Sequence, residues 1–253
     1  MGNKMRRIAV ALSKGGVGKT TTAINLAAGL VRQGRSVLLI DMDTQGQAGK
    51  VLGAPPAAGL AEVLNQESTL EAALVEARPR LWLLSGGRSL AGLKRVIDRK
   101  DFGGERTVSE ALAPLDGCYD YAIIDTAPGW DVLTVNALFY SQEVVAPVAL
   151  EVMALQGLIE FTHSLSAIGR YHSGLTLSYV LPTFLDRRVR KSEEILRQLQ
   201  AHFGAEVCAP IRYNVRLSEA PGYGQTVYEY APGSPGAEDY LALTKRIMQD
   251  EQS

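Results

Sequence analysis

Features that would mark particular protein classes are scarce in this sequence. It contains only two cysteines, Cys118 and Cys208, and their spacing excludes the C-x-x-C motifs of metal and redox sites. We expect both to be buried thiols in a reducing compartment. No apolar run approaches the length of a membrane span, and the first residues do not form a signal-peptide core. The sequence therefore predicts a cytoplasmic protein with no membrane partner.

A large excess of charge of either sign is also absent. With 26 basic and 27 acidic residues the net charge is −1, so no global field draws the chain to nucleic acid or anionic lipid. Any such binding requires a local patch. The hydrophobic fraction of 46% is ordinary for a globular protein, and 253 residues suffice for one large core. We expect residues 1–253 to form a single domain.

Short apolar runs alternate with helical patterns along the chain. Several runs, such as VLLI, YAII and VVAPV, are apolar on both faces, as in parallel strands that helices cover on both sides. The pattern predicts an α/β fold, a doubly wound and mostly parallel sheet with helices on both faces. Strands are expected at residues 7–12, 36–41, 81–84, 119–125, 143–148, 175–181 and 207–211. Helices are expected at residues 20–33, 60–75, 89–97, 107–112, 132–140, 155–171, 191–203 and 237–249.

A glycine-rich loop, with the sequence SKGGVGKTTT, joins the first expected strand to the first expected helix. Gly15, Gly16 and Gly18 allow the backbone to adopt positive φ angles and to approach a ligand closely. The N–H groups of the loop and of the first helical turn then point at one place, which makes an anion site. A plain turn between a strand and a helix is the alternative.

The residues after these glycines favour a nucleotide. Lys19 adds a positive charge, and the Thr20 hydroxyl can ligate a Mg²⁺ ion bound to β- and γ-phosphates. The loop departs from the G-x-x-x-x-G-K-[ST] pattern because Ser13 stands where the first glycine is expected. A second lysine, Lys14, follows it directly.

Acidic residues end two of the expected strands. Asp41 and Asp43 close the second strand and lie on one face as long as that strand continues. Carboxylates at this edge suit contacts with metal, water or lysine, although they could also open a solvent-facing turn. Asp125 ends the apolar run YAII, which is the form of a Walker B carboxylate that orders Mg²⁺.

The motifs KGGVGKTT, LLIDMDTQG and YAIIDTAPG, in this order and spacing, resemble the ParA/MinD group of deviant Walker A ATPases. The similarity extends over nearly the whole chain. The segments VAPV, ALQGL, NVRLSEAP and GAEDYL resemble the ParA branch specifically. The resemblance implies a P-loop NTPase fold, ATP and Mg²⁺ as cofactors, and Mg²⁺-dependent ATP hydrolysis.

The resemblance also implies roles for single residues. Lys14 matches the signature lysine, which reaches across an ATP-dependent homodimer to phosphates bound by the other subunit. Lys19 would hold the β- and γ-phosphates of its own subunit, and Thr21 the α-phosphate. The nucleotide-binding residues implied in the loop are Lys14, Gly15, Gly16, Val17, Gly18, Lys19, Thr20 and Thr21.

The resemblance assigns the two strand-end carboxylates different tasks. Asp43 matches the residue that positions or activates the attacking water, so that Lys14, Lys19 and Asp43 form the implied catalytic set. Asp125, together with Thr20, is implied as a Mg²⁺ ligand. Asn214 matches a residue at the adenine, but Arg212 stands where the family usually has proline, so base contacts are expected to differ in detail.

A basic run, DRRVRK, contains Arg188 and Arg190 and precedes an amphipathic helical pattern. In the ParA branch, arginines in this region and at Arg216 bind the DNA backbone without sequence preference. Phosphate contacts of this kind are salt-sensitive and are doubled by dimerisation. The alternative is a solvated helix start whose charges pair with Glu193 and Glu194.

The resemblance thus implies a nucleoid-associated ATPase that positions or segregates a cargo and is released when a ParB-like or other activator stimulates hydrolysis. The cargo could be a plasmid, a chromosome or a protein organelle. The alternative is a MinD-like membrane-associated regulator of division sites, although residues 241–253 end in acidic and polar side chains and predict poor lipid affinity. A metal-cluster carrier or metabolic P-loop enzyme is a third alternative, and the chain lacks the cysteine pair that a cluster carrier needs.

Overall fold

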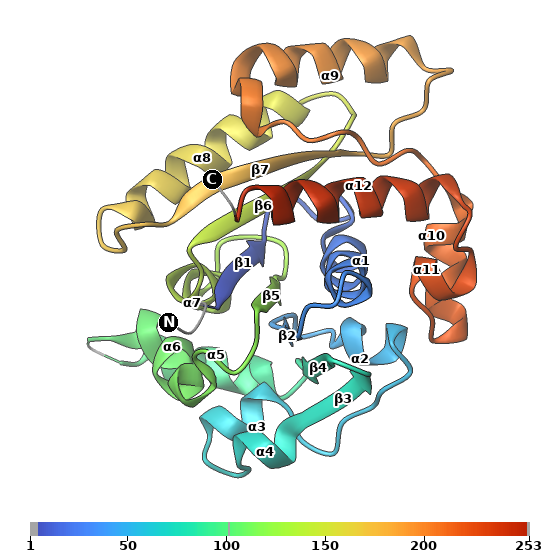
Figure 1. The fold of residues 1–253 in the computed structure, drawn as a ribbon. Helices are drawn as coiled ribbons and strands as arrows, with labels where there is room; N and C mark the ends of the chain where they lie inside the picture. Colours follow the sequence, from blue (N-terminus) through green and yellow to red (C-terminus); the bar gives the residue numbers. More distant parts are fainter. Residues whose placement is uncertain (1–4, 101, 252–253) are drawn as a thin grey trace.

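The computed structural model describes residues 5–100 and 102–251. Its centre is a seven-stranded sheet with the strand order β3-β4-β2-β5-β1-β6-β7 (Figure 1). Neighbouring strands run parallel, except for the antiparallel pair β3–β4. The strands are β1 (Arg6–Val10), β2 (Val37–Asp41), β3 (Leu74–Arg78), β4 (Leu81–Leu84), β5 (Tyr121–Asp125), β6 (Glu143–Ala149) and β7 (Thr176–Thr183).

Helices of very different length connect these strands and follow the last one. The α-helices are α1 (Lys19–Arg32), α2 (Gln47–Val51), α3 (Leu60–Leu64), α4 (Leu70–Ala73), α5 (Leu90–Asp98), α6 (Thr107–Leu112), α7 (Val132–Tyr140), α8 (Ala154–Gly169), α9 (Arg190–Phe203), α10 (Val215–Glu219), α11 (Val227–Tyr230) and α12 (Pro235–Gln249). Short 3₁₀ turns are η1 (Gly104–Arg106), η2 (Ala113–Leu115), η3 (Gly204–Glu206) and η4 (Ala220–Tyr223). Among the residues that the structure describes, no helix is long and apolar enough to cross a bilayer.

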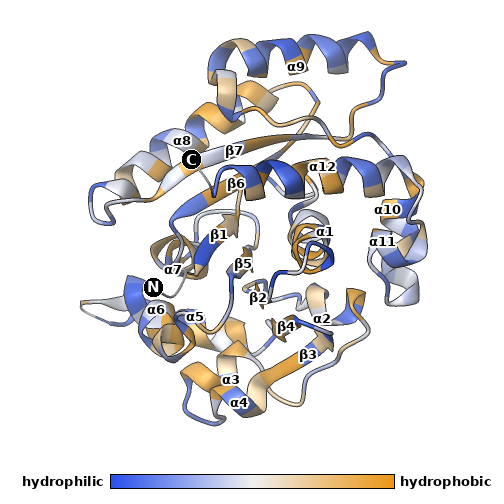
Figure 2. Cartoon of the chain, in the orientation of Figure 1, coloured by the Kyte–Doolittle hydropathy of each residue, from blue (hydrophilic) through white to orange (hydrophobic). Residues whose placement is uncertain are grey.

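Helices cover both faces of the sheet, and the strand side chains alternate between the resulting cores. In β2, Val37 and Leu39 join the core under α1 and α12, whereas Leu38 and Ile40 join the core under α5, α6 and α7. A third cluster connects α8 and α9 to β6 and β7. Figure 2 shows hydrophilic and hydrophobic segments alternating along α9 and α12, as expected of helices with one buried side. The predicted α/β fold with a mostly parallel sheet is therefore confirmed.

The strand expected at residues 207–211 does not form. Cys208 N and Ile211 N donate hydrogen bonds of 2.8 Å to carbonyls of β7, but the pairing is limited to isolated bridges. Pro210 lies between these donors and has no N–H of its own, so a regular ladder cannot continue. The segment instead passes along the sheet edge as an irregular chain.

The helix expected at residues 60–75 is also wrong, because α3, α4 and the edge strand β3 occupy this segment. Gln66 adopts a left-handed backbone with φ of 61°, which ends the helical path. The Thr69 side chain then caps α4 by accepting a hydrogen bond from Ala72 N at 3.2 Å. Pairing with β4 overrides the helical pattern in the residues that follow.

The two cysteines differ in environment. Cys208 is buried, as expected, whereas Cys118 is exposed in the turn that precedes β5. Composition predicted a buried thiol at both positions, but turns between helices and strands run over the surface.

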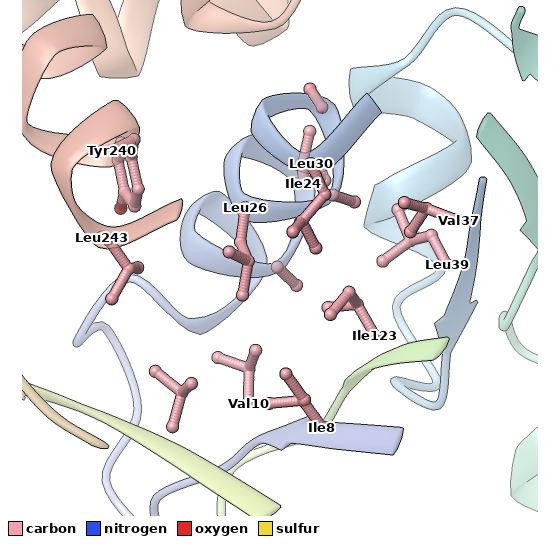
Figure 3. Close-up of a cluster of buried hydrophobic side chains, with 14 of the residues drawn as sticks. Ile8, Val10, Ile24, Leu26, Leu30, Val37, Leu39, Ile123, Tyr240 and Leu243 are labelled. Atoms are coloured by element: carbon pink, nitrogen blue, oxygen red, sulfur yellow. The ribbon is translucent and has the colours of Figure 1, made fainter. Parts of the chain in front are cut away.

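The last helix packs on α1 at a contact that leaves no room for a side chain at Gly29. A Cβ atom there would lie 2.3 Å from Thr244 Oγ1 and 2.8 Å from the Tyr228 hydroxyl. Tyr240 of α12 is buried in the same contact, and its hydroxyl oxygen lies 3.1 Å from Thr22 Oγ1. Figure 3 shows Tyr240 and Leu243 on the side of α12 that faces α1. The helix that begins at the glycine-rich loop is thereby fixed to the end of the chain.

We predict that Gly29→Ala lowers the free energy of unfolding by about 1–3 kcal/mol, because the new methyl group overpacks the α1–α12 contact. Gly92→Ala is the matched control, since Gly92 lies in α5 and an added Cβ meets nothing within 4 Å. That variant should gain up to about 1 kcal/mol from helix propensity. Urea unfolding followed by circular dichroism measures both, and a Gly29→Ala protein as stable as Gly92→Ala would contradict the prediction.

Candidate functional site

A cavity of about 530 Å³ lies where the carboxyl ends of the central parallel strands meet the start of α1. This edge is where ligands bind in doubly wound sheets. The cavity is lined by Gly15, Gly16, Gly18, Lys19, Thr20, Thr21, Asp43, Gln47, Thr126, Pro128, Thr183, Phe184, Ile211, Arg212, Tyr213, Asn214, Leu217, Ser218 and Tyr240.

The glycine-rich loop has the backbone geometry of an anion site. Gly16 and Gly18 adopt φ angles of 72° and 90°, which only glycine takes without strain. Gly18 is the N-cap of α1, and no described side chain caps the first turn. The N–H groups of that turn are therefore available to an anion in the cavity.

Lys19 brings the positive charge to this anion site. Only 7% of Lys19 is exposed, and its Nζ donates a 2.7 Å hydrogen bond to the Lys14 carbonyl, which closes the loop on itself. Burial lowers the pKa of Lys19, while the nearby carboxylates of Asp125 and Asp43 act in the opposite direction. A buried ammonium of this kind gains from an anionic ligand.

The Lys14 side chain points away from the cavity and toward Glu151. It is absent from the described residues that line the cavity, and its Nζ forms an ion pair of 2.6 Å with Glu151 Oε1. About half of each side chain in this pair is exposed. Val17 is also outside the cavity, because its side chain is buried in the third core cluster. Val17 contributes to the loop through its backbone carbonyl, which accepts a hydrogen bond from Thr183 Oγ1.

Asp125 is a buried carboxylate at the end of β5, and the Thr20 hydroxyl and the charge of Lys19 favour its ionised form. It is fully buried, and neither Oδ1 nor Oδ2 has a hydrogen-bond partner among the described residues. Burial raises the pKa of Asp125 well above its ordinary value, and the adjacent charge of Asp41 adds to this effect. Such a site fits a cation, because unpaired buried carboxylates are costly and oxygen ligands suit Mg²⁺. The Thr20 hydroxyl lies in the neighbouring cavity wall and could share the ion.

Asp41 and Asp43 differ more than their spacing suggested. Asp41 is buried beside Asp125 in the β2–β5 register, and burial raises its pKa to about 6. Its oxygens accept hydrogen bonds from Asp43 N at 2.9 Å and Ala48 N at 3.0 Å. Asp41 thus shapes the loop, whereas Asp43 reaches the cavity.

Three hydrogen bonds that the motifs did not reveal fix the glycine-rich loop and the strand before it to segments far along the chain. Thr126 Oγ1 donates to the Val10 carbonyl at 2.9 Å, and Thr183 Oγ1 donates to the Val17 carbonyl at 3.0 Å. Gly129 N donates to the Ser13 carbonyl at 2.9 Å. The two threonines follow or end buried strands, and this position at the carboxyl edge is the signal that could have identified them.

The far end of the cavity is built from the segment between the isolated bridges and α10. Asn214 lines the cavity, and its side chain caps α10 by accepting a 2.8 Å hydrogen bond from Arg216 N. Arg212 is fixed to α12, because its backbone N and its Nε donate to the Asp239 carboxylate at 2.8 Å and 3.0 Å. An arginine thus anchors the position at which the family usually has proline.

The basic candidates lie outside the cavity, on the turn before α9, the start of α9 and α10. Leu185 and Arg212 form an isolated bridge, which brings the turn before α9 beside the segment leading to α10. Arg188 pairs with Asp186 at 2.7 Å, and Arg216 pairs with Glu219 at 2.7 Å. Arg190, the first residue of α9, takes part in no ion pair among the described residues.

Comparison with known proteins agrees with this geometry. The family model described as "AAA domain" matches residues 5–176. The chromosome-partitioning ATPase Soj of Thermus thermophilus is 40% identical over 97% of this chain and 96% of its own length. The chromosome partitioning protein ParA of Myxococcus xanthus is 36% identical over 96% of this chain and 88% of its own length.

One similar protein has been solved with a nucleotide and a metal ion bound. The structure named cobyrinic acid a,c-diamide synthase, from Mycobacterium smegmatis with bound ADP and magnesium, is 32% identical with a TM-score of 0.85. The match covers 98% of this chain and 96% of that one. ATP and Mg²⁺ fit the anion site, the buried Lys19 and the unpaired Asp125 described above. The chain belongs to the ParA/Soj family of chromosome-partitioning P-loop ATPases, and it is a Mg²⁺-dependent ATP hydrolase.

Proposed function

We propose that this ATPase closes into an ATP-dependent homodimer, binds nonspecific double-stranded DNA, and thereby segregates or positions a cargo on the nucleoid. A ParB-like or other cargo-bound activator then stimulates hydrolysis and releases the dimer. The observation that carries the proposal is the position of Lys14, which projects from the glycine-rich loop but does not reach its own cavity.

An outward lysine suits a dimer that shares its nucleotides. The Lys14–Glu151 pair is half-exposed, and ion pairs of this kind contribute about 0–1 kcal/mol. Exchanging Glu151 for a phosphate on a second subunit therefore costs little. Beside Glu151, Val152 and Met153 are exposed apolar side chains, as expected of a surface that another subunit covers.

Within each subunit we assign Lys19 and Thr21 to the phosphates, and Asp43 to the attacking water. Asp125 and Thr20 would hold Mg²⁺. The supporting observations are the buried ammonium of Lys19, the exposure of Asp43 to the cavity, and the unpaired oxygens of Asp125. Asn214 is assigned to the nucleoside end.

The proposed DNA contacts are Arg188, Arg190 and Arg216. Two of these arginines pair with acidic neighbours within three residues, and those side chains are exposed. Phosphates compete well for such arginines, since release of counterions from DNA favours the exchange. Because the net charge is −1, the binding has to come from this local group.

Membrane association is the less favoured alternative. The apolar residues Tyr240, Leu243 and Ile247 of α12 are buried against the chain's own core. An amphipathic helix binds lipid only through an apolar face that is free to insert. Co-sedimentation with anionic liposomes would favour this alternative if ATP promoted it.

We predict that Lys14→Ala abolishes ATP-dependent dimerisation while nucleotide binding by the monomer persists through Lys19. Light scattering after size-exclusion chromatography, with an ATP analogue and Mg²⁺, measures the dimer. The matched control is Glu151→Gln, which removes the partner of Lys14 but keeps its charge and should still dimerise. A Lys14→Ala protein that dimerises and hydrolyses ATP normally would refute the proposed role in the partner's site.

We predict that Arg188→Ala and Arg216→Ala each weaken ATP-dependent binding to nonspecific duplex DNA. The slope of log affinity against log salt should fall by about 1 for each arginine removed. Arg95→Ala is the control, because Arg95 is exposed on α5, away from α9 and α10 (Figure 1). Fluorescence anisotropy at several salt concentrations gives the slopes. If ATP-loaded wild-type protein does not bind duplex at low salt, the proposed DNA step is wrong.

A further inference from the structure

Phe184 has an unusual backbone for a bulky residue. It follows β7 directly and adopts a φ of 58°, in the left-handed region that favours glycine. An aromatic residue stays in this region only where its surroundings impose the conformation. Such positions gather at ligand sites.

The residues on either side of Phe184 impose this conformation. The Thr183 side chain donates to the Val17 carbonyl of the glycine-rich loop, and the Thr183 carbonyl accepts a 3.1 Å hydrogen bond from Leu150 N. On the other side, Leu185 N donates to the Ile211 carbonyl at 3.0 Å, and the Leu185 carbonyl accepts from Tyr213 N at 2.9 Å. The backbone must turn sharply between these two anchored residues.

The turn aims an apolar ring at the cavity instead of at the core. Phe184 lines the cavity and leaves 43% of its surface exposed. Its Cζ lies 3.8 Å from the place that a Cβ on Gly18 would occupy, so the ring borders the start of α1. Burial in the core therefore does not explain why this strained position carries a phenylalanine.

The occupant follows from the two kinds of side chain that line the cavity. Lys19, Thr20 and Thr21 supply polar groups, which suit phosphates, whereas Phe184, Ile211 and Tyr213 supply apolar and aromatic surface. The part of ATP that offers a flat apolar surface is its base. From these contacts we infer that Phe184 is a positioning residue for the nucleoside, with its ring packed against the purine face.

Stacking of this kind makes a specific prediction about selectivity. Every purine has a π-face, so the ring contributes affinity without distinguishing adenine from guanine. Removal of one base-stacking aromatic typically weakens binding about 5- to 150-fold. ADP and GDP should lose affinity by the same factor, while inorganic pyrophosphate should lose none.

The test measures binding of MgADP, MgGDP and Mg-pyrophosphate to Phe184→Ala, Phe184→Gly and Phe184→Tyr by isothermal titration calorimetry. Phe184→Ala and Phe184→Gly should bind both nucleoside diphosphates more weakly, and Phe184→Tyr, which keeps a ring, should bind as the wild type does. Tyr171→Ala is the control, since Tyr171 is 78% exposed and lies outside the cavity lining.

Melting temperatures measured without nucleotide show whether a variant loses affinity because the fold is less stable or because the ring is missing from the cavity. Phe184→Gly should melt higher than Phe184→Ala, because glycine adopts a φ of 58° without strain. Unchanged ADP affinity in Phe184→Ala and Phe184→Gly would overturn the inference. So would an equal loss for pyrophosphate, which would mean that the ring supports only the loop. These measurements need neither DNA nor dimerisation, so they stand apart from the function proposed above.

Discussion

Buried charge at the carboxyl edge of the parallel strands is the constraint on which this site depends. Lys19 and Asp125 are both buried, and Asp125 has no hydrogen-bond partner among the described residues. Burying a charge is unfavourable, and burial shifts the pKa of each of these groups. A buried lysine suits an anion and a buried aspartate suits a cation, and a Mg²⁺–nucleotide offers both.

Hydrogen bonds from the surrounding structure keep these charged groups in place. The Thr183 side chain ties the glycine-rich loop to β7, and the Thr126 side chain ties the residue after β5 to the end of β1. Asp41 holds the loop that carries Asp43. The glycine-rich loop is therefore held by β7 and by the segment after β5, through the Thr183 side chain and Gly129 N. Preorganisation of this kind reduces the entropy lost when a nucleotide binds.

The C-terminal part of the chain supplies further walls of the same cavity, at residues 211–214, Leu217, Ser218 and Tyr240. α12 contacts the start of α1 through Tyr240 and Thr22 and holds Arg212 through Asp239, so the last helix fixes two segments that line the cavity. The strained Phe184 turn lies between these fixed parts. Lys14 is different, because it lies on the surface in an exposed pair and is free to change partner. A rigid pocket with one mobile cation suits an ATPase whose nucleotide is proposed to join two subunits.

The sequence by itself determined the sheet, the glycine-rich loop and the acidic strand ends, because periodicity and glycine spacing are local properties. It also determined the family, through short motifs whose order and spacing match it, and the similarity to a relative covers 97% of the chain. Only the tertiary structure decided that Pro210 prevents a last strand, that residues 74–78 form an edge strand, and that Asp41 is structural while Asp43 reaches the cavity. These outcomes, like the turn at Phe184, depend on hydrogen bonds between segments far apart in sequence, which no local pattern encodes.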